Sequence, residues 1–258
     1  MIKSTIVLIA TALMLLSSQI KAQQNDMQVW TGAGLEIQMN DKFDLDIKGM
    51  TSFIPADNFD LNFAQATMAL SYDIAPNWKI DAGDQVNIIP ESSRMVRNRI
   101  YTRGTYEFKF SDQFKSTHAM QVEFHSANEI RYSERLILIN SITTRHRLTA
   151  LKLRPSISYW LYYNIGGDPI QYYDLSGDKI VSQPANGFHR GRLYMSVNSK
   201  ISDHFRMGVY FMNQREFNFL TPEYREINVI NPNSGNIARD FNNYNVAGLS
   251  LTFTVGNE

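Results

Sequence analysis

Apolar and polar residues alternate with a period of two along several long stretches of this chain. In residues 96–110 the even positions are apolar or small for the most part, and the odd positions carry Arg, Glu and Lys. The same alternation recurs in four further stretches, 43–53, 189–201, 205–217 and 247–255. Successive side chains of a strand point to opposite faces, whereas helical spacing fits none of these stretches. The pattern therefore predicts strands with one apolar and one polar face.

The length of these stretches distinguishes a membrane barrel from a soluble sheet. Residues 43–53 and 96–110 are far longer than a typical soluble strand of about 5–6 residues. A tilted strand that crosses a bilayer needs about 9–11 residues. Aromatic rings at the ends of the apolar faces, such as Phe53 and Phe108, suit the girdles of membrane barrels. These features favour a membrane barrel over the alternative, a secreted β-sandwich with a solvated charged face.

The connections alternate between tight and long. The tight ones set an Asp or Asn before an aromatic ring, as in 40–43, 76–79, 111–115 and 202–206. Longer, polar or glycine-rich connections are expected at 90–95, about 126–143, 166–187 and 218–240. The alternation slips after Phe63, which indicates a bulge, and no turn can be placed within 134–165.

The fold class predicted from these elements is all-β, a transmembrane antiparallel up-and-down β-barrel of about 10–12 strands. Twelve strands are slightly favoured because bacterial barrels have an even number.

The N-terminus has the three-part plan of a secretory signal peptide. Lys3 provides the positive charge, Ile6 to Leu16 is an apolar run broken only by Thr11, and Ala22 ends a suitable cleavage site. The apolar run is shorter than the roughly 20 residues of a membrane-spanning helix, which disfavours an anchor. We therefore expect a signal peptide at 1–22, a barrel domain at 23–258 and a location in the outer membrane.

Composition limits the partners. The chain has 25 basic and 25 acidic residues and no cysteine, so disulfides are excluded and no charge excess favours nucleic acid. The expected partners are outer-membrane lipid and, during biogenesis, the barrel-assembly machinery. The sequence does not identify a small-solute ligand.

If the apolar faces contact lipid, the charged faces line the lumen. The candidate lumen residues are Arg97, Arg99, Arg103, Glu107, Glu123, Arg145, Arg147, Arg190, Arg192, Arg206 and Glu216, together with Asp44, Asp46, Lys48 and Lys109. One interpretation is a narrow passive channel that prefers anions, because rings of Arg set the field in a pore. The other is a structural barrel filled by cross-strand pairs of Arg and carboxylate, since open channels are typical of barrels with about 16 strands.

Several features resemble a known family. They are a first strand with Val29-Trp30, arginine pairs two residues apart (97/99, 145/147, 190/192) and a final strand containing Gly248 to Leu251. Together they resemble a family of uncharacterised bacterial outer-membrane β-barrel proteins catalogued as a domain of unknown function, the 2490 family. The resemblance implies a barrel in the outer membrane and no established activity, so it transfers no functional residues.

No enzymatic activity, metal or cofactor is expected. The histidines at 118, 125, 146, 189 and 204 are scattered, and no His or Cys pair has zinc spacing. Among them His125 shares the lumen face with Glu123, while Ser126 is on the opposite face or in a loop. An outer-membrane lipid or ester hydrolase centred on His125 is therefore an alternative function. A surface adhesin or receptor that uses the loops 166–187 and 218–240 is another.

Overall fold

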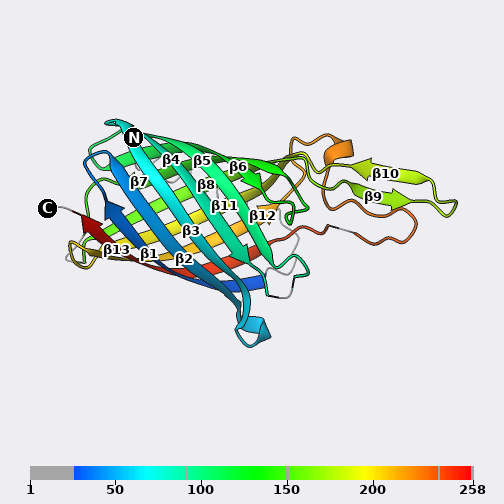
Figure 1. Ribbon diagram of the computed structural model, residues 1–258, viewed down its shortest axis with the longest axis horizontal. Coiled ribbons are helices and arrows are strands. Elements are labelled where there is room, and N and C mark those ends of the chain that lie inside the picture. The colour runs from blue at the N-terminus through cyan, green and yellow to red at the C-terminus, as the bar shows by residue number, and fades with distance from the viewer. Residues whose placement is uncertain (1–25, 91, 149–150, 238, 257–258) are drawn as a thin grey trace, which may run out of the picture.

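The computed structural model describes residues 26–90, 92–148, 151–237 and 239–256. In this part of the chain, eleven long strands close into a barrel (Figure 1). They are β1 (Asp26–Gln38), β2 (Phe43–Ile54), β3 (Asp60–Ala75), β4 (Trp78–Ile88), β5 (Val96–Lys109), β6 (Phe114–His125), β7 (Glu134–Thr144), β8 (Leu153–Ile165), β11 (Gly187–Lys200), β12 (Phe205–Glu216) and β13 (Tyr244–Gly256). The predicted signal peptide, residues 1–22, lies outside the described residues. No helix in the described part is long and apolar enough to cross a membrane.

The barrel closes through a parallel pair of strands. β1 pairs with β13 in parallel, from Asp26 opposite Tyr244 to Gln38 opposite Gly256, and every other wall pair is antiparallel. The all-β closed barrel is thus confirmed, but the preferred count of twelve strands and the purely antiparallel wall are wrong. The reason is geometric. In an up-and-down chain with an odd number of strands, the first and last strands run in the same direction, so closure must be parallel.

The two ends of the barrel differ in the length of their connections. Four turns of two to four residues, 39–42, 76–77, 110–113 and 201–204, and the longer connection 145–152 join strands at one end. The other end carries the connections 55–59, 89–95, 126–133, 166–186 and 217–243. The 166–186 connection contains a hairpin of β9 (Ile170–Tyr173) and β10 (Lys179–Gln183), which projects beyond the barrel wall (Figure 1). Two short 3-10 helices, η1 (Pro55–Asp57) and η2 (Glu223–Arg225), also lie in these longer connections.

Sequence and structure differ most in the middle of the chain. The long connection expected at about 126–143 is only 126–133, because β7 begins at Glu134. The turn that could not be placed within 134–165 is 145–152. The register of β2 against β3 shifts between Ser52 and Phe53, opposite Phe63 and Leu61. This irregularity is the bulge that the slip in alternation near Phe63 predicted.

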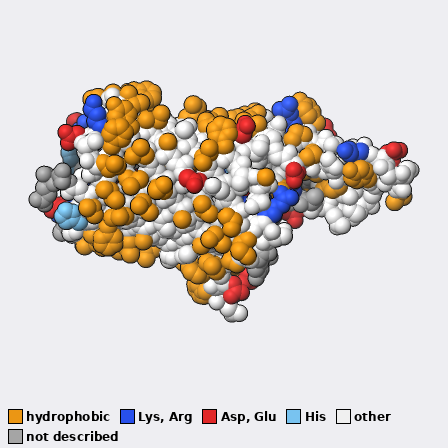
Figure 2. Space-filling model, in the orientation of Figure 1, with side chains coloured by type: hydrophobic (Ala, Val, Ile, Leu, Met, Phe, Trp, Pro, Cys, Tyr) orange, Lys and Arg blue, Asp and Glu red, His pale blue; other side chains and the backbone are white. Residues whose placement is uncertain are grey.

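The side chains are arranged in the opposite way to those of a soluble protein. Large apolar residues such as Ile100, Met120 and Val209 are more than half exposed on the outer face. Figure 2 shows such residues in a broad band over the wall strands. Polar and charged side chains, among them Glu123 and Arg135, are buried inside. An outward apolar band with a polar interior is the arrangement of a barrel that spans a membrane.

Candidate functional site in the barrel lumen

The barrel encloses a cavity of about 420 Å³ that opens toward solvent. Inward-facing side chains of β1 to β8 and of β11 to β13 line it. Seven of its lining residues are basic and three are acidic: Lys48, Arg97, Arg99, Arg103, Arg135, Arg190 and Arg192, against Asp46, Glu123 and Glu129. The wall of the cavity therefore carries an excess of positive charge.

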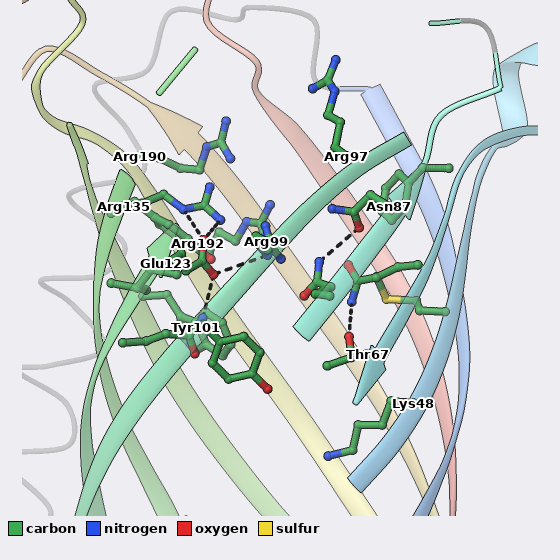
Figure 3. Close-up of a pocket in the computed structure, with 18 of the residues that line it drawn as sticks. Lys48, Thr67, Asn87, Arg97, Arg99, Tyr101, Glu123, Arg135, Arg190 and Arg192 are labelled. Atoms are coloured by element: carbon green, nitrogen blue, oxygen red, sulfur yellow. Dashed lines mark hydrogen bonds and ion pairs between the residues drawn. The ribbon is translucent and has the colours of Figure 1, made fainter. Parts of the chain in front are cut away.

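The cavity exists because the wall strands contribute side chains of unequal size. β3 and β4 place Thr67, Ala69 and Gln85 on the inside. β7 and β8 place Arg135 and Tyr162 there, and both are buried. In Figure 3 four arginines gather around Glu123 on one side, namely Arg99, Arg135, Arg190 and Arg192. Lys48, Thr67, Asn87 and Arg97 lie on the other side. One half of the lumen is filled by large side chains and the other half is open.

Glu123 is the centre of the filled half. Its carboxylate is 1% exposed and accepts hydrogen bonds from Arg135 Nε at 2.9 Å and Nη2 at 2.6 Å. Gln121 donates to the other oxygen at 2.6 Å, and His125 Nε2 lies 3.1 Å from Oε2. Arg99 Nε is 3.6 Å from Oε1. One carboxylate therefore faces two guanidinium groups.

Most other cations of the lumen have a carboxylate of their own. Arg103 Nε donates to Asp81 at 2.7 Å, Arg97 to Glu129 at 3.1 Å and Arg190 Nε to Glu216 at 2.9 Å. Lys48 lies 3.3 Å from Asp46. Nearer the end with the short turns, Lys115 donates to Glu107 at 2.6 Å, and Arg206 pairs with Glu36. This ladder of pairs is what the structural interpretation of the sequence expects.

Arg99 and Arg192 are the exceptions among the lining cations. Arg99 shares Glu123 with Arg135, and its Nε has no hydrogen-bond partner within the described residues. Arg192 donates to neutral groups, Gln214 Oε1 at 2.7 Å and the Tyr244 hydroxyl at 3.1 Å. Its guanidinium also lies over the rings of Tyr162 and Trp30, at 5.3 and 5.8 Å from their centroids. These two arginines account for much of the surplus positive charge beside the cavity.

The structure places the sequence-based lumen residues unevenly. The cavity is lined by Arg97, Arg99, Arg103, Glu123, Arg190 and Arg192. The remaining strand residues face the interior in ion pairs: Glu107 and Glu216 pair with adjacent strands, and Arg206 on β12 pairs with Glu36 on β1, across β13. Arg145 and Arg147 lie in the turn 145–152, beyond the strand ends, rather than on the lumen wall. There Arg145 lies 3.7 Å from Asp112, and Arg147 donates to the Lys152 carbonyl at 2.9 Å.

Arg135, Tyr132 and Tyr162 are lumen residues that the sequence analysis missed. Arg135 shares its inward face with Ile137 and Ile139, so charge does not alternate with apolar residues along β7. The signal that was available is Arg135 directly before the apolar run Leu136 to Ile139.

The hydrolase centre considered around His125 is not assembled. His125 Nε2 pairs with Glu123, and its ring meets Tyr132 edge-on at 4.8 Å. Ser126 Oγ instead accepts a hydrogen bond from the backbone N–H of Asn98 at 3.1 Å. Within the described residues no three His, Asp or Glu side chains form a cluster suited to a metal ion.

Comparison with known proteins places the chain. Residues 27–225 match the family described as "Protein of unknown function (DUF2490)". The chain belongs to this family. This confirms the resemblance that the sequence indicated. No curated protein matches the sequence. A solved structure described as "NanC porin structure in rhombohedral crystal form" is similar at 9% identity and a TM-score of 0.46, over 88% of this chain and 98% of that one.

Proposed function

We propose that this protein lies in the bacterial outer membrane and forms a narrow passive channel that prefers small anions. The apolar outer band, the polar interior and the closed wall support a membrane-spanning position. Lipid and, during biogenesis, the barrel-assembly machinery are the partners that such a position requires. Inside, the filled half of the lumen limits the passage to small solutes.

The observation that carries the proposal is the surplus charge of Arg99 and Arg192. A cation without its own carboxylate in a partly enclosed, weakly screened site attracts a mobile anion more strongly than a paired cation does. Both residues line the open cavity, so their fields act on a solute in it. A purely structural barrel would have no need of guanidinium groups there that lack a carboxylate of their own.

The test is ion conduction through the refolded protein in planar bilayers with a gradient of KCl. The wild type should give small conductance steps and a reversal potential that indicates preference for chloride. Arg99→Gln and Arg192→Gln should each move the reversal potential toward zero. Arg145→Gln is the matched control, because it removes the same charge from a turn outside the cavity.

Two results would overturn the channel. A correctly folded wild type that stays silent in the bilayer leaves the structural barrel as the better interpretation. Conduction that prefers cations, or that Arg145→Gln alters as much as Arg99→Gln does, removes the role of the lumen arginines.

A further inference from the structure

Three polar residues form a hydrogen-bonded chain on the outer, lipid-facing surface of the barrel. Ser116 and His118 are two residues apart on β6, and Asn140 lies directly opposite His118 on β7. Ser116 Oγ is 3.1 Å from His118 Nε2, and His118 Nδ1 is 2.7 Å from Asn140 Oδ1. Their faces are opposite to those of the lumen residues Glu123 and Arg135, because they lie at even positions and the lumen residues at odd ones.

This order of groups is the order of a nucleophile, a base and a residue that orients the base. Asn140 Oδ1 can only accept, so it fixes the proton of the imidazole on Nδ1. Nε2 is then free to accept the proton of the Ser116 hydroxyl, which lies within hydrogen-bond distance. A serine and a base at about 2.6–3.2 Å, with the base held by a third group, form the arrangement used in nucleophilic acyl transfer.

The position of Ser116 along β6 indicates which substrate could reach it. Ser116 is two residues past Phe114, the first residue of β6, which puts it roughly 5 Å deeper than that ring for a tilted strand. The rings of Phe108, Phe110 and Phe114 surround this level, with Phe108 stacked on His118 at 5.7 Å and Phe110 on Phe114 at 6.1 Å. Aromatic girdles lie at the boundary between headgroups and hydrocarbon. The ester bonds of phospholipids occupy that same boundary.

Polar groups on a lipid-facing surface need a reason, because each of them loses water there. Asn140 accepts from His118, and the single proton of the Ser116 hydroxyl can be directed either to His118 Nε2 at 3.1 Å or to the Ser141 carbonyl at 3.2 Å. Thr144, two residues beyond the cross-strand partner of Ser116, has a buried hydroxyl without a hydrogen-bond partner within the described residues. Thr144 is the direct partner of Phe114 and therefore a diagonal neighbour of Ser116 on the same face, and a free donor in that position is suited to an oxyanion.

We propose that Ser116, His118 and Asn140 form a catalytic site that hydrolyses the acyl esters of membrane phospholipids. Ser116 Oγ attacks the ester carbonyl carbon, and His118 Nε2 takes the hydroxyl proton. The tetrahedral intermediate collapses as the bond from carbon to the glycerol oxygen breaks, and His118 returns the proton to that oxygen. Water then attacks the acyl-serine and gives one proton to His118. The fatty acid leaves, and the proton returns to Ser116.

Asn140 and Thr144 have different roles in this sequence of steps. Asn140 is a positioning residue, since it contacts His118 and not the reacting ester. Thr144 donates to the carbonyl oxygen as negative charge develops on it. Phe108 is the cross-strand partner of Ser116, its ring stacks on His118, and Ser116 is only 7% exposed, so we expect this ring to move when a lipid reaches the nucleophile.

The proposal departs from the expectation of no enzymatic activity, which stays a prediction. It goes beyond the channel proposed above and needs the membrane position of the barrel but not conduction through it. Arg99→Gln should therefore alter ion selectivity and leave lipid hydrolysis intact. Absence of conduction would refute the channel alone, and absence of lipid hydrolysis would refute the catalytic site alone.

The test uses the full chain purified from denatured inclusion bodies, refolded, and checked for folding by its gel mobility before and after boiling. The protein is placed in vesicles of phosphatidylethanolamine and phosphatidylglycerol, and released fatty acid is measured. A fluorophosphonate probe for reactive serines is applied in parallel, and the labelled peptide is identified by mass spectrometry. Ser199→Ala is the matched control, because Ser199 is also a buried serine on the outer face near the short turns and donates to the Leu151 carbonyl.

The wild type and Ser199→Ala should release fatty acid and take up the probe at Ser116. Ser116→Ala and His118→Ala should lose at least about 10²-fold in rate. Asn140→Ala should lose less and shift the pH profile, and Asn140→Asp should recover activity because its carboxylate accepts the same hydrogen bond. Thr144→Val should lower kcat by roughly tenfold or more and leave KM unchanged. Phe108→Ala should speed labelling.

Two outcomes would overturn the proposal. One is a folded wild type that neither releases fatty acid nor takes up the probe. The other is activity in Ser116→Ala equal to that of Ser199→Ala. Hydrolysis of a soluble short-chain ester without hydrolysis of vesicle lipid would retain the nucleophile but reject phospholipid as its substrate.

Discussion

Glu123→Gln tests whether one buried carboxylate holds the filled half of the lumen together. Glu123 is 1% exposed and accepts from Arg135, Gln121 and His125, with Arg99 Nε at 3.6 Å. The substitution keeps the shape of the side chain and removes its charge. Two guanidinium groups, those of Arg99 and Arg135, then share no counter-charge.

The geometry makes the loss larger than that of a charge alone. Arg135 and His125 face Oε2, whereas Gln121 donates to Oε1. An amide has one acceptor and one donor end, so its NH₂ group meets donors in either orientation. Removing one partner of a buried ion pair costs about 3–5 kcal/mol, and we expect a loss of this size in the free energy of unfolding.

The matched control is Glu107→Gln on the neighbouring strand. Glu107 accepts from Lys115 at 2.6 Å, a cross-strand pair like that of Glu123 but more exposed, with side chains 36% and 26% accessible. A pair of this kind contributes about 0–1 kcal/mol. Urea unfolding of both variants in lipid vesicles, followed by tryptophan fluorescence and gel mobility, gives the comparison. If Glu123→Gln loses no more stability than Glu107→Gln, the carboxylate does not organise the lumen.

Two further substitutions test the wall itself. Asp84 lies on the outer face at mid-strand, and its Oδ1 is buried without a hydrogen-bond partner within the described residues. Asp84→Leu should therefore raise the free energy of unfolding in vesicles by about 1–2 kcal/mol. An unchanged or lower free energy of unfolding would contradict the placement of Asp84 against lipid. A Cβ at Gly248 would overlap the ring of Tyr210, whereas one at Gly104 would meet nothing within 4 Å. Gly248→Ala should therefore lose about 1–3 kcal/mol and Gly104→Ala close to none, and equal losses in urea unfolding would refute this packing.

The alternation of side chains predicted most of the wall. The stretch 43–53 became β2, 96–110 became β5 and 205–217 became β12, each within one residue at either end. The reason is that lipid on one side and a polar lumen on the other impose a period of two on every strand. The faces follow from the same cause, so Arg97 and Arg99 were placed inside without any knowledge of their neighbours.

The count of strands did not follow from alternation. Each hairpin is a local feature, but the number of hairpins decides whether the last strand meets the first in parallel. A single ambiguous region, 134–165, was therefore enough to change the closure of the whole barrel. Its strands carry polar and apolar residues on the same lumen face, as Arg135 beside Ile137 shows.

Only part of the candidate site could be predicted from the sequence, for a related reason. Parity identifies which side chains share the lumen, but not which carboxylate each cation contacts. Arg103 meets Asp81 on the adjacent strand, while Arg97 meets Glu129 in the 126–133 connection. That Arg99 and Arg192 have no carboxylate of their own is seen only when the other cations that line the cavity have been assigned to theirs.

Polar residues on the lipid-facing surface are the places where alternation is least informative and the structure most so. A strand tolerates an outward polar side chain near the membrane boundary if its hydrogen bonds are satisfied, because the loss of water is then compensated. Asp84, at mid-strand, has a carboxylate oxygen without a hydrogen-bond partner within the described residues, and it therefore destabilises the fold. Ser116, His118 and Asn140 are compensated by one another at the level of the aromatic girdle. The same departure from the pattern thus has two different meanings, and the hydrogen bonds distinguish a destabilising residue from a group of residues arranged to react.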